Sequence, residues 1–157
     1  MRNKIWLGVI IAGWATVAAA SSILDLRREI APATQWLEVK SVHVYDTWEG
    51  EPPFMTVNRV IRQPFVGEWF ATVRIISDGS NSFACLAEGR ASYAVDAAMP
   101  GNLSLDWWTH PVKCRMPPGR YRLDTIWIIR PAGYPEKALF TQSNVFEVHP
   151  HYRASPH

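Results

Sequence analysis

The sequence predicts an all-β domain, folded as an antiparallel sandwich, behind one hydrophobic helix at the N-terminus. An apolar run without charge or proline covers Ile5–Leu24. Beyond Pro32, about eight short stretches alternate apolar and polar residues at a spacing of roughly 10–15 residues, and none has the period of an amphipathic helix. The 12 prolines lie almost wholly between these stretches, as the hydrogen bonding of a sheet requires.

The apolar run is long enough to form a transmembrane helix. As a helix, Ile5–Leu24 would span about 30 Å, the thickness of a bilayer core. Trp6 lies where an interfacial ring would sit, and no proline interrupts the helix before Pro32. These features favour an uncleaved anchor that continues as a short stalk. Two alternatives stay open: a signal peptide cleaved near Ala20, after the small residues Ala18–Ala20, or a buried helix of a soluble protein.

The charges around the run predict its orientation. Arg2, Lys4 and the free amine precede it, and Arg27 and Arg28 follow it. The slight excess on the N-terminal side favours a single-pass membrane protein with its N-terminus in the cytoplasm and its domain periplasmic or extracellular. Cleavage near Ala20 would instead give a secreted protein.

The chain divides into three parts. Residues 1–32 form the anchor or signal helix with a short stalk, residues 33–149 form the β domain, and residues 150–157 form a tail. The expected strands cover residues 37–44, 54–61, 69–75, 82–87, 91–95, 103–108, 121–129 and 140–148. Loops or turns are expected at 46–53, 78–81, 88–89, 100–102, 117–119 and 131–135. A break in the alternation near Ser41 predicts a β-bulge.

The two cysteines predict one disulfide. Cys85 and Cys114 are the only cysteines of the chain, and an even count in an exported domain favours a bridge between them. The alternative is a pair of buried free thiols, as in a reducing compartment.

The composition argues against several classes of function. Beyond residue 30, basic and acidic side chains cancel, which disfavours binding to nucleic acid. The sequence has no nucleophile elbow, P-loop, dinucleotide fingerprint or C-x-x-C motif. His149 and His151 are expected in an exposed tail, and the acids at 46, 49 and 51 lack calcium-loop spacing. We therefore expect no enzyme activity, no metal and no cofactor.

Tryptophan and arginine supply the candidate binding residues. Trp107 and Trp108 are adjacent, so in a strand one ring would face the core and the other would face outward. Trp48 lies beside an acidic loop, and exposed tryptophan is a common anchor of interfaces. Arg120 and Arg122 belong to a local basic group. The alternative is that the tryptophans close the sandwich ends and the arginines only aid solubility.

Residues Pro117–Leu123, with the sequence PPGRYRL, resemble the turn-and-strand element of immunoglobulin-like and fibronectin type III-like domains. The pattern departs from antibody-type domains, because Cys114 precedes Tyr121 and no cysteine follows it. The resemblance implies an immunoglobulin-like sandwich of the kind found in bacterial or phage envelope proteins. There such domains serve as non-enzymatic modules for binding or structural assembly. A protein or an envelope polymer would be the partner. A minor pilin-like assembly subunit and an envelope-polymer hydrolase are the alternatives.

Overall fold

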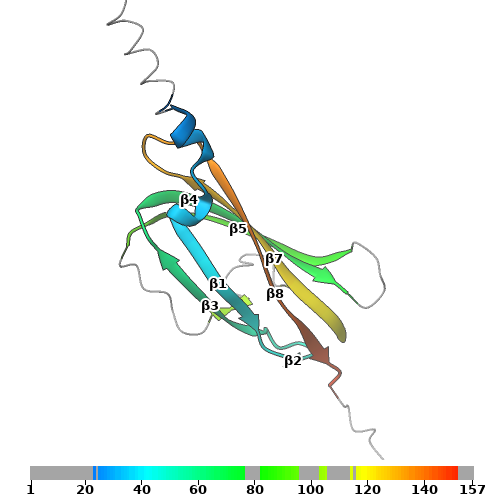
Figure 1. The fold of residues 1–157 in the computed structure, drawn as a ribbon. Coiled ribbons are helices and arrows are strands. Elements are labelled where there is room, and N and C mark those ends of the chain that lie inside the picture. The colour runs from blue at the N-terminus through cyan, green and yellow to red at the C-terminus, as the bar shows by residue number, and fades with distance from the viewer. Residues whose placement is uncertain are drawn as a thin grey trace, which may run out of the picture.

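The structure is a computed structural model that describes residues 23, 25–76, 82–95, 103–105, 114 and 116–151. It is mostly β, with a helix over residues 25–30 and a 3-10 turn, η1 (Ala33–Gln35), before the first strand (Figure 1). The strands are β1 (Leu37–Val44), β2 (Thr47–Trp48), β3 (Phe54–Ile61), β4 (Phe65–Ile75), β5 (Phe83–Tyr93), β6 (Leu103–Ser104), β7 (Gly119–Arg130) and β8 (Lys137–His149).

The strands form two sheets that pack face to face. The smaller sheet has the order β1-β3-β6, and the larger has the order β2-β8-β7-β4-β5, with β7 in the middle. The pairs are antiparallel except β2 with β8, which is parallel. The predicted class, a two-sheet β domain, is confirmed. The predicted bulge is also confirmed, because the β1–β3 register shifts between Val39 and Ser41.

The core fills the space between the sheets in two clusters. The larger contains Val44 and Met55 from the small sheet and Tyr121 and Phe146 from the large one, all less than 2% exposed. The second cluster, nearer the N-terminal helix, is built from the following residues: Trp36, Leu37, Ile61, Phe65, Tyr93, Trp127 and Ile129. Alternate residues of each strand thus point inward, as a half-buried strand requires.

The predicted turn at Glu88–Gly89 is wrong, because β5 runs through it without a break. Gly89 pairs with Trp69 of β4. A Cβ atom at Gly89 would lie 2.4 Å from Cζ2 of the Trp69 indole. Glycine is therefore required here to admit a large ring against the strand, and the same residue type that marks turns in sequence has a different use in this sheet.

Other boundaries also differ from the sequence prediction, and β4 begins at Phe65 rather than at residue 69. The loop expected at 46–53 contains β2, which pairs with the end of β8. The last strand begins at Lys137 rather than Phe140, since its first residues pair with β7. Of the strand expected at 103–108, the structure has β6 over two residues, and residues 106–113 lie outside the described part of the chain.

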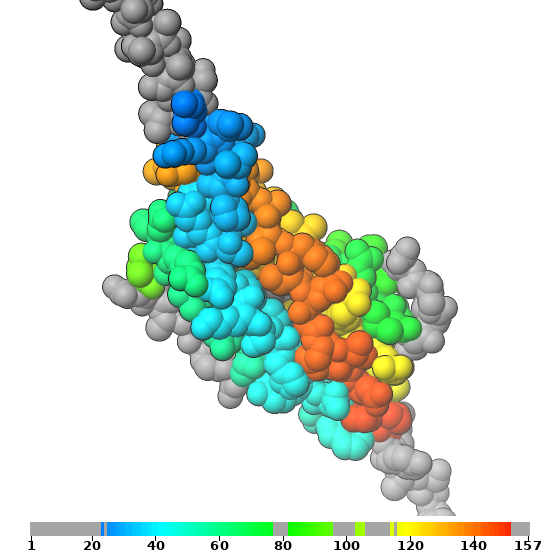
Figure 2. Space-filling view, viewed as in Figure 1, coloured from blue at the N-terminus to red at the C-terminus, as the bar shows by residue number. Residues whose placement is uncertain are grey.

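Side chains of β8 and of the loop after β1 join the edges of the two sheets where β1 and β8 lie side by side (Figure 2). Asn144 imitates a strand backbone: its Oδ1 accepts from the Val44 amide at 2.8 Å, and its Nδ2 donates to the Val44 carbonyl at 2.9 Å. Asp46 accepts from the Glu147 amide at 2.8 Å. These bonds satisfy backbone groups at the sheet edge and fix β1 against β8.

Tyr121 closes the turn that precedes β7. Its hydroxyl donates to the carbonyl of Pro117, four residues upstream, over 2.6 Å. The ring is almost fully buried, and burial raises the pKa of the Tyr121 hydroxyl. The PPGRYRL segment therefore has a defined local geometry in which the buried tyrosine fixes the entry of the chain into the central strand.

The N-terminal helix lies at one end of the domain and the last described residues lie at the other (Figures 1 and 2). Lys137 donates from Nζ to the carbonyls of Arg28 and Glu29, the last turn of the helix, which suits the negative end of a helix dipole. The predicted membrane segment, residues 5–24, lies outside the described residues except for Ile23. Within the described part, no helix has the length and apolarity that a membrane crossing needs.

Candidate binding face

The candidate site is the side of the five-stranded sheet that faces away from β1, β3 and β6; we call it the outer face. Such a face is usually polar when it borders water. Here it carries many exposed large apolar side chains, which follow from strand alternation and register: Trp48, Phe70, Phe83, Leu86, Ile126, Phe140 and Val145. Exposed apolar side chains that are neighbours on one face mark an interaction site more often than apolar side chains scattered singly.

Three of these side chains form a row across the middle of the outer face. Phe70 of β4 pairs with Ile126 of β7, and Ile126 pairs with Phe140 of β8. They are 41%, 45% and 56% exposed, respectively. Directly opposed residues on one face have Cβ atoms about 5 Å apart, so the three side chains are neighbours. We call them the central row.

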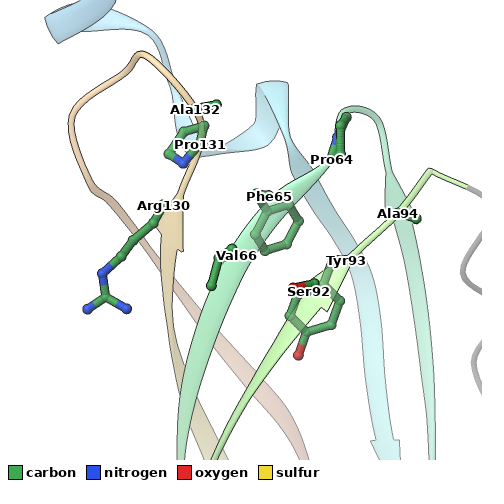
Figure 3. A pocket seen from close by; sticks show the side chains of 9 residues that line it. All are labelled: Pro64, Phe65, Val66, Ser92, Tyr93, Ala94, Arg130, Pro131 and Ala132. Atoms are coloured by element: carbon green, nitrogen blue, oxygen red, sulfur yellow. The ribbon is translucent and has the colours of Figure 1, made fainter.

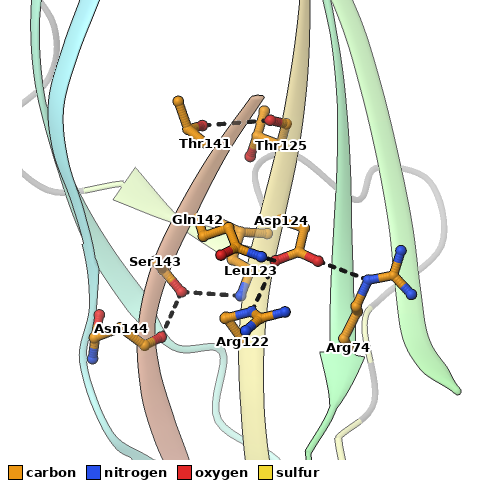
Figure 4. A network of polar contacts seen from close by, with 9 residues as sticks. All are labelled: Arg74, Arg122, Leu123, Asp124, Thr125, Thr141, Gln142, Ser143 and Asn144. Carbon is orange, nitrogen blue, oxygen red and sulfur yellow. Dashed lines mark hydrogen bonds and ion pairs between the residues drawn. The ribbon is translucent and has the colours of Figure 1, made fainter. Parts of the chain in front are cut away.

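On the side of the central row that lies away from the N-terminal helix, a polar network borders the row (Figure 4). Asp124, only 6% exposed, accepts from Nε of Arg74 at 2.7 Å and from Nε of Arg122 at 3.0 Å. Gln142 adds a third bond to the same carboxylate at 3.2 Å. A buried carboxylate with three donors is well satisfied, and it fixes both guanidinium groups against the sheet.

On the side of the central row that lies nearer the N-terminal helix, a second polar network borders the row. Arg130 lies 2.7 Å from Glu68 and 2.8 Å from Glu136, and Arg90 lies 3.6 Å from Glu68. The hydrogen bond from Arg130 lowers the pKa of Glu68, and the same bond raises the pKa of Arg130. Both groups are therefore charged at neutral pH, and each neutralises the other.

The predicted binding residues fall partly on this face. Arg120 and Arg122 lie on outward positions of β7, with Arg120 3.6 Å from Glu147 and Arg122 bound to Asp124. Trp48 lies on the edge strand beside His149, with ring centroids 5.3 Å apart. The structure thus places Trp48, Arg120 and Arg122 on one face. Trp107 and Trp108 lie outside the described residues.

The central row was not predicted from the sequence, because alternation within one strand shows which of its residues share a face and not which strands pair. A signal was present in Ile126–Ile129, an apolar run that fills both faces of β7. Such a run is typical of a strand covered on both sides. Phe70, in the middle of β4, is a similar signal.

The end of the sandwich near the N-terminal helix has a shallow hollow of about 540 Å³ (Figure 3). Its lining is mostly apolar and comes from the ends of β4, β5 and β7: Pro64, Phe65, Val66, Ser92, Tyr93, Ala94, Arg130, Pro131 and Ala132. Arg130 is the charged member, and its guanidinium already pairs with Glu68 and Glu136. The hollow therefore lacks the converging free polar groups of a small-molecule site.

The described residues contain no group of three histidine, cysteine, aspartate or glutamate side chains placed to hold a metal ion. Cys85 and Cys114 form a disulfide with a Cα–Cα distance of 5.5 Å, as predicted, so neither carries a thiol. No known family model matches this chain, and no curated protein has a significantly similar sequence. The outer face is thus the feature from which a function can be argued.

Proposed function

We propose that this chain is a non-enzymatic binding module: an immunoglobulin-like β-sandwich, anchored in a membrane by residues 5–24, whose domain lies in a periplasmic or extracellular compartment. The observation that carries the proposal is the central row. Phe70, Ile126 and Phe140 expose apolar surface on the middle strands of a sheet, where a free domain would be expected to present polar side chains. A protein is the partner that a row of exposed apolar side chains between charged groups fits best.

The composition of the outer face supports a protein partner. Protein interfaces are enriched in aromatic residues and arginine and depleted in lysine. The described outward positions of this sheet carry phenylalanine, tryptophan and arginine, and none of them is a lysine. Arg74 and Arg122 are held in place by Asp124, so they lose little side-chain freedom when a partner binds.

Other features support the remaining parts of the proposal. The bond from Tyr121 to Pro117 has the form of the tyrosine corner of immunoglobulin-like sandwiches. The disulfide favours an oxidising compartment, and hence export of the domain. The apolar run of residues 5–24 favours a membrane anchor.

Site-specific photocrosslinking in intact membranes tests the proposal. A benzoylphenylalanine at position 140 should give a discrete protein adduct when intact membranes are irradiated first and washed with carbonate afterwards. The same residue at position 54 should give none, although Phe54 on the other sheet is equally exposed, at 54% against 56% for Phe140. Equal adducts at both positions, or none at 140, would contradict the proposed binding face. Loss of the protein from the washed membranes would contradict the anchor.

A further inference from the structure

We infer that the partner of the outer face is a second copy of this chain, which packs against it about a two-fold axis that runs along β7. This inference rests on the proposed function, because it names the partner of the same face. It follows from the symmetry, the charge and the size of the face.

The central row is symmetric about the middle strand. Ile126 lies on β7, and Phe70 and Phe140 lie one strand away on either side of it. A two-fold axis parallel to β7 would exchange the two sides. Ile126 would meet its own copy, and each Phe70 would meet Phe140 of the partner subunit. An isologous interface requires this kind of self-complementary pattern.

The rows on both sides of the central row obey the same symmetry. Thr72 and Gln142 flank Asp124, and Glu68 and Ala138 flank Ile128. The axis would therefore place Thr72 against Gln142 of the partner subunit, and both side chains are polar and uncharged. It would place the charged Glu68 against the small Ala138 of the partner subunit. On the axis itself Asp124 would lie near its own copy, and each of these carboxylates keeps Arg74 and Arg122 of its own chain as counter-charges.

The charges of the outer face are already paired within one chain. Arg74 and Arg122 share Asp124, Arg130 and Arg90 pair with Glu68, and Arg120 pairs with Glu147. A strongly charged partner would have to compete with these pairs. A second copy requires no such exchange, because Arg120, Arg122 and Arg130, which would lie near their own copies on the axis, each keep an acidic partner in their own chain.

The size of the face suits a dimer. Ten residue pairs join β4 to β7, which at about 3.3 Å per residue gives a length of roughly 33 Å, and five strands about 4.8 Å apart are roughly 24 Å wide. Because β2 is short, the face is smaller than the full rectangle, and each copy offers about 650 Å² of surface to the interface. The total, about 1,300 Å², lies within the range of stable protein interfaces.

The position of the N-terminus is compatible with this axis. The N-terminal helix lies at one end of the domain, and β8 runs from that end to the opposite one, antiparallel to β7 (Figure 1). Rotation about an axis along β7 leaves both helices at the same end. Two chains anchored in one membrane could therefore form this dimer without strain on their stalks.

Light scattering of the full chain in detergent micelles tests the inference. The wild-type protein should have the protein mass of two 17.8 kDa chains. Phe140→Arg should weaken the dimer at least tenfold, and Phe54→Arg, the control on the other sheet, should leave it unchanged. Phe70→Asp should also give monomers. The double variant Phe70→Asp/Phe140→Arg should restore the dimer, because each new aspartate would face an arginine of the partner subunit.

The outcomes separate the inference from the proposed function. If the wild type is a monomer at all concentrations, or if the double variant stays monomeric while its circular dichroism shows a folded domain, the dimer is wrong. Co-expression of two differently tagged copies with benzoylphenylalanine at 140 should give an adduct that carries both tags. Adducts with a different protein alone would overturn the dimer and leave the binding face standing, and no adduct at 140 would overturn both.

Discussion

Gly89→Val is expected to destabilise the domain by about 3 kcal/mol, the upper part of the range for overpacking. A Cβ at this position would lie 2.4, 2.6 and 2.8 Å from three atoms of the Trp69 indole, all far inside van der Waals contact. The ring packs against both core clusters, so it has little room to move. Urea unfolding followed by tryptophan fluorescence measures the loss.

The sign of this effect is informative, because valine is a much better strand former than glycine. If residues 88–89 formed a turn or lay free of Trp69, Gly89→Val would be neutral or stabilising. Ser92→Val, an exposed position of the same strand, is the control and should change stability by less than about 0.5 kcal/mol. Adding Trp69→Leu to Gly89→Val should recover part of the loss, which a double-mutant cycle would measure as coupling.

Loss of the disulfide is the second large effect. Cys114→Ala should lower stability by about 2–4 kcal/mol, because the bridge closes a loop between residues 29 apart. Both cysteines also pack against the larger core cluster, so the bridge holds the chain before β7 against β5. We expect faster protease cleavage between Ser92 and Leu105 in the variant, since local opening becomes easier.

Reductant provides the control for this prediction. Dithiothreitol should destabilise the wild-type protein by about the same 2–4 kcal/mol. It should have no effect on Cys85→Ala/Cys114→Ala, which has no bridge to reduce. Equal stability of the wild type with and without reductant would show that the bridge contributes little, and would weaken the case for an oxidising compartment.

Strands with a strong alternating pattern could be predicted from the sequence, and the rest of the fold could not. The expected strand at 54–61 coincides with β3, and the expected strand at 121–129 lies within β7, where Tyr121, Leu123 and Trp127 alternate and are all buried. The turn at Glu88–Gly89 was predicted wrongly, because sequence alone does not distinguish a glycine that makes room for the ring of Trp69 from a glycine that forms a turn. β2 was missed since its two residues depend on pairing with β8, over a hundred positions away.

The candidate site illustrates a related limit. Single residues such as Arg120 and Arg122 could be proposed from local composition, because a basic group is visible in sequence. The central row joins Phe70, Ile126 and Phe140, which are separated by 56 and 14 positions along the chain and meet only through strand register. Register depends on long-range pairing, so one sequence without its fold does not show that these three side chains share a face.

In the native membrane, the outer face of the five-stranded sheet should be covered by a protein. Carbene footprinting of the unmodified full chain tests it most directly, because Phe140 and Phe54 are matched in residue type and in exposed fraction, at 56% and 54%. In native membranes Phe140 should be labelled several-fold less than Phe54, and dilution of the protein in detergent should make the two equal. Equal labelling of Phe140 and Phe54 in the membrane would contradict the claim.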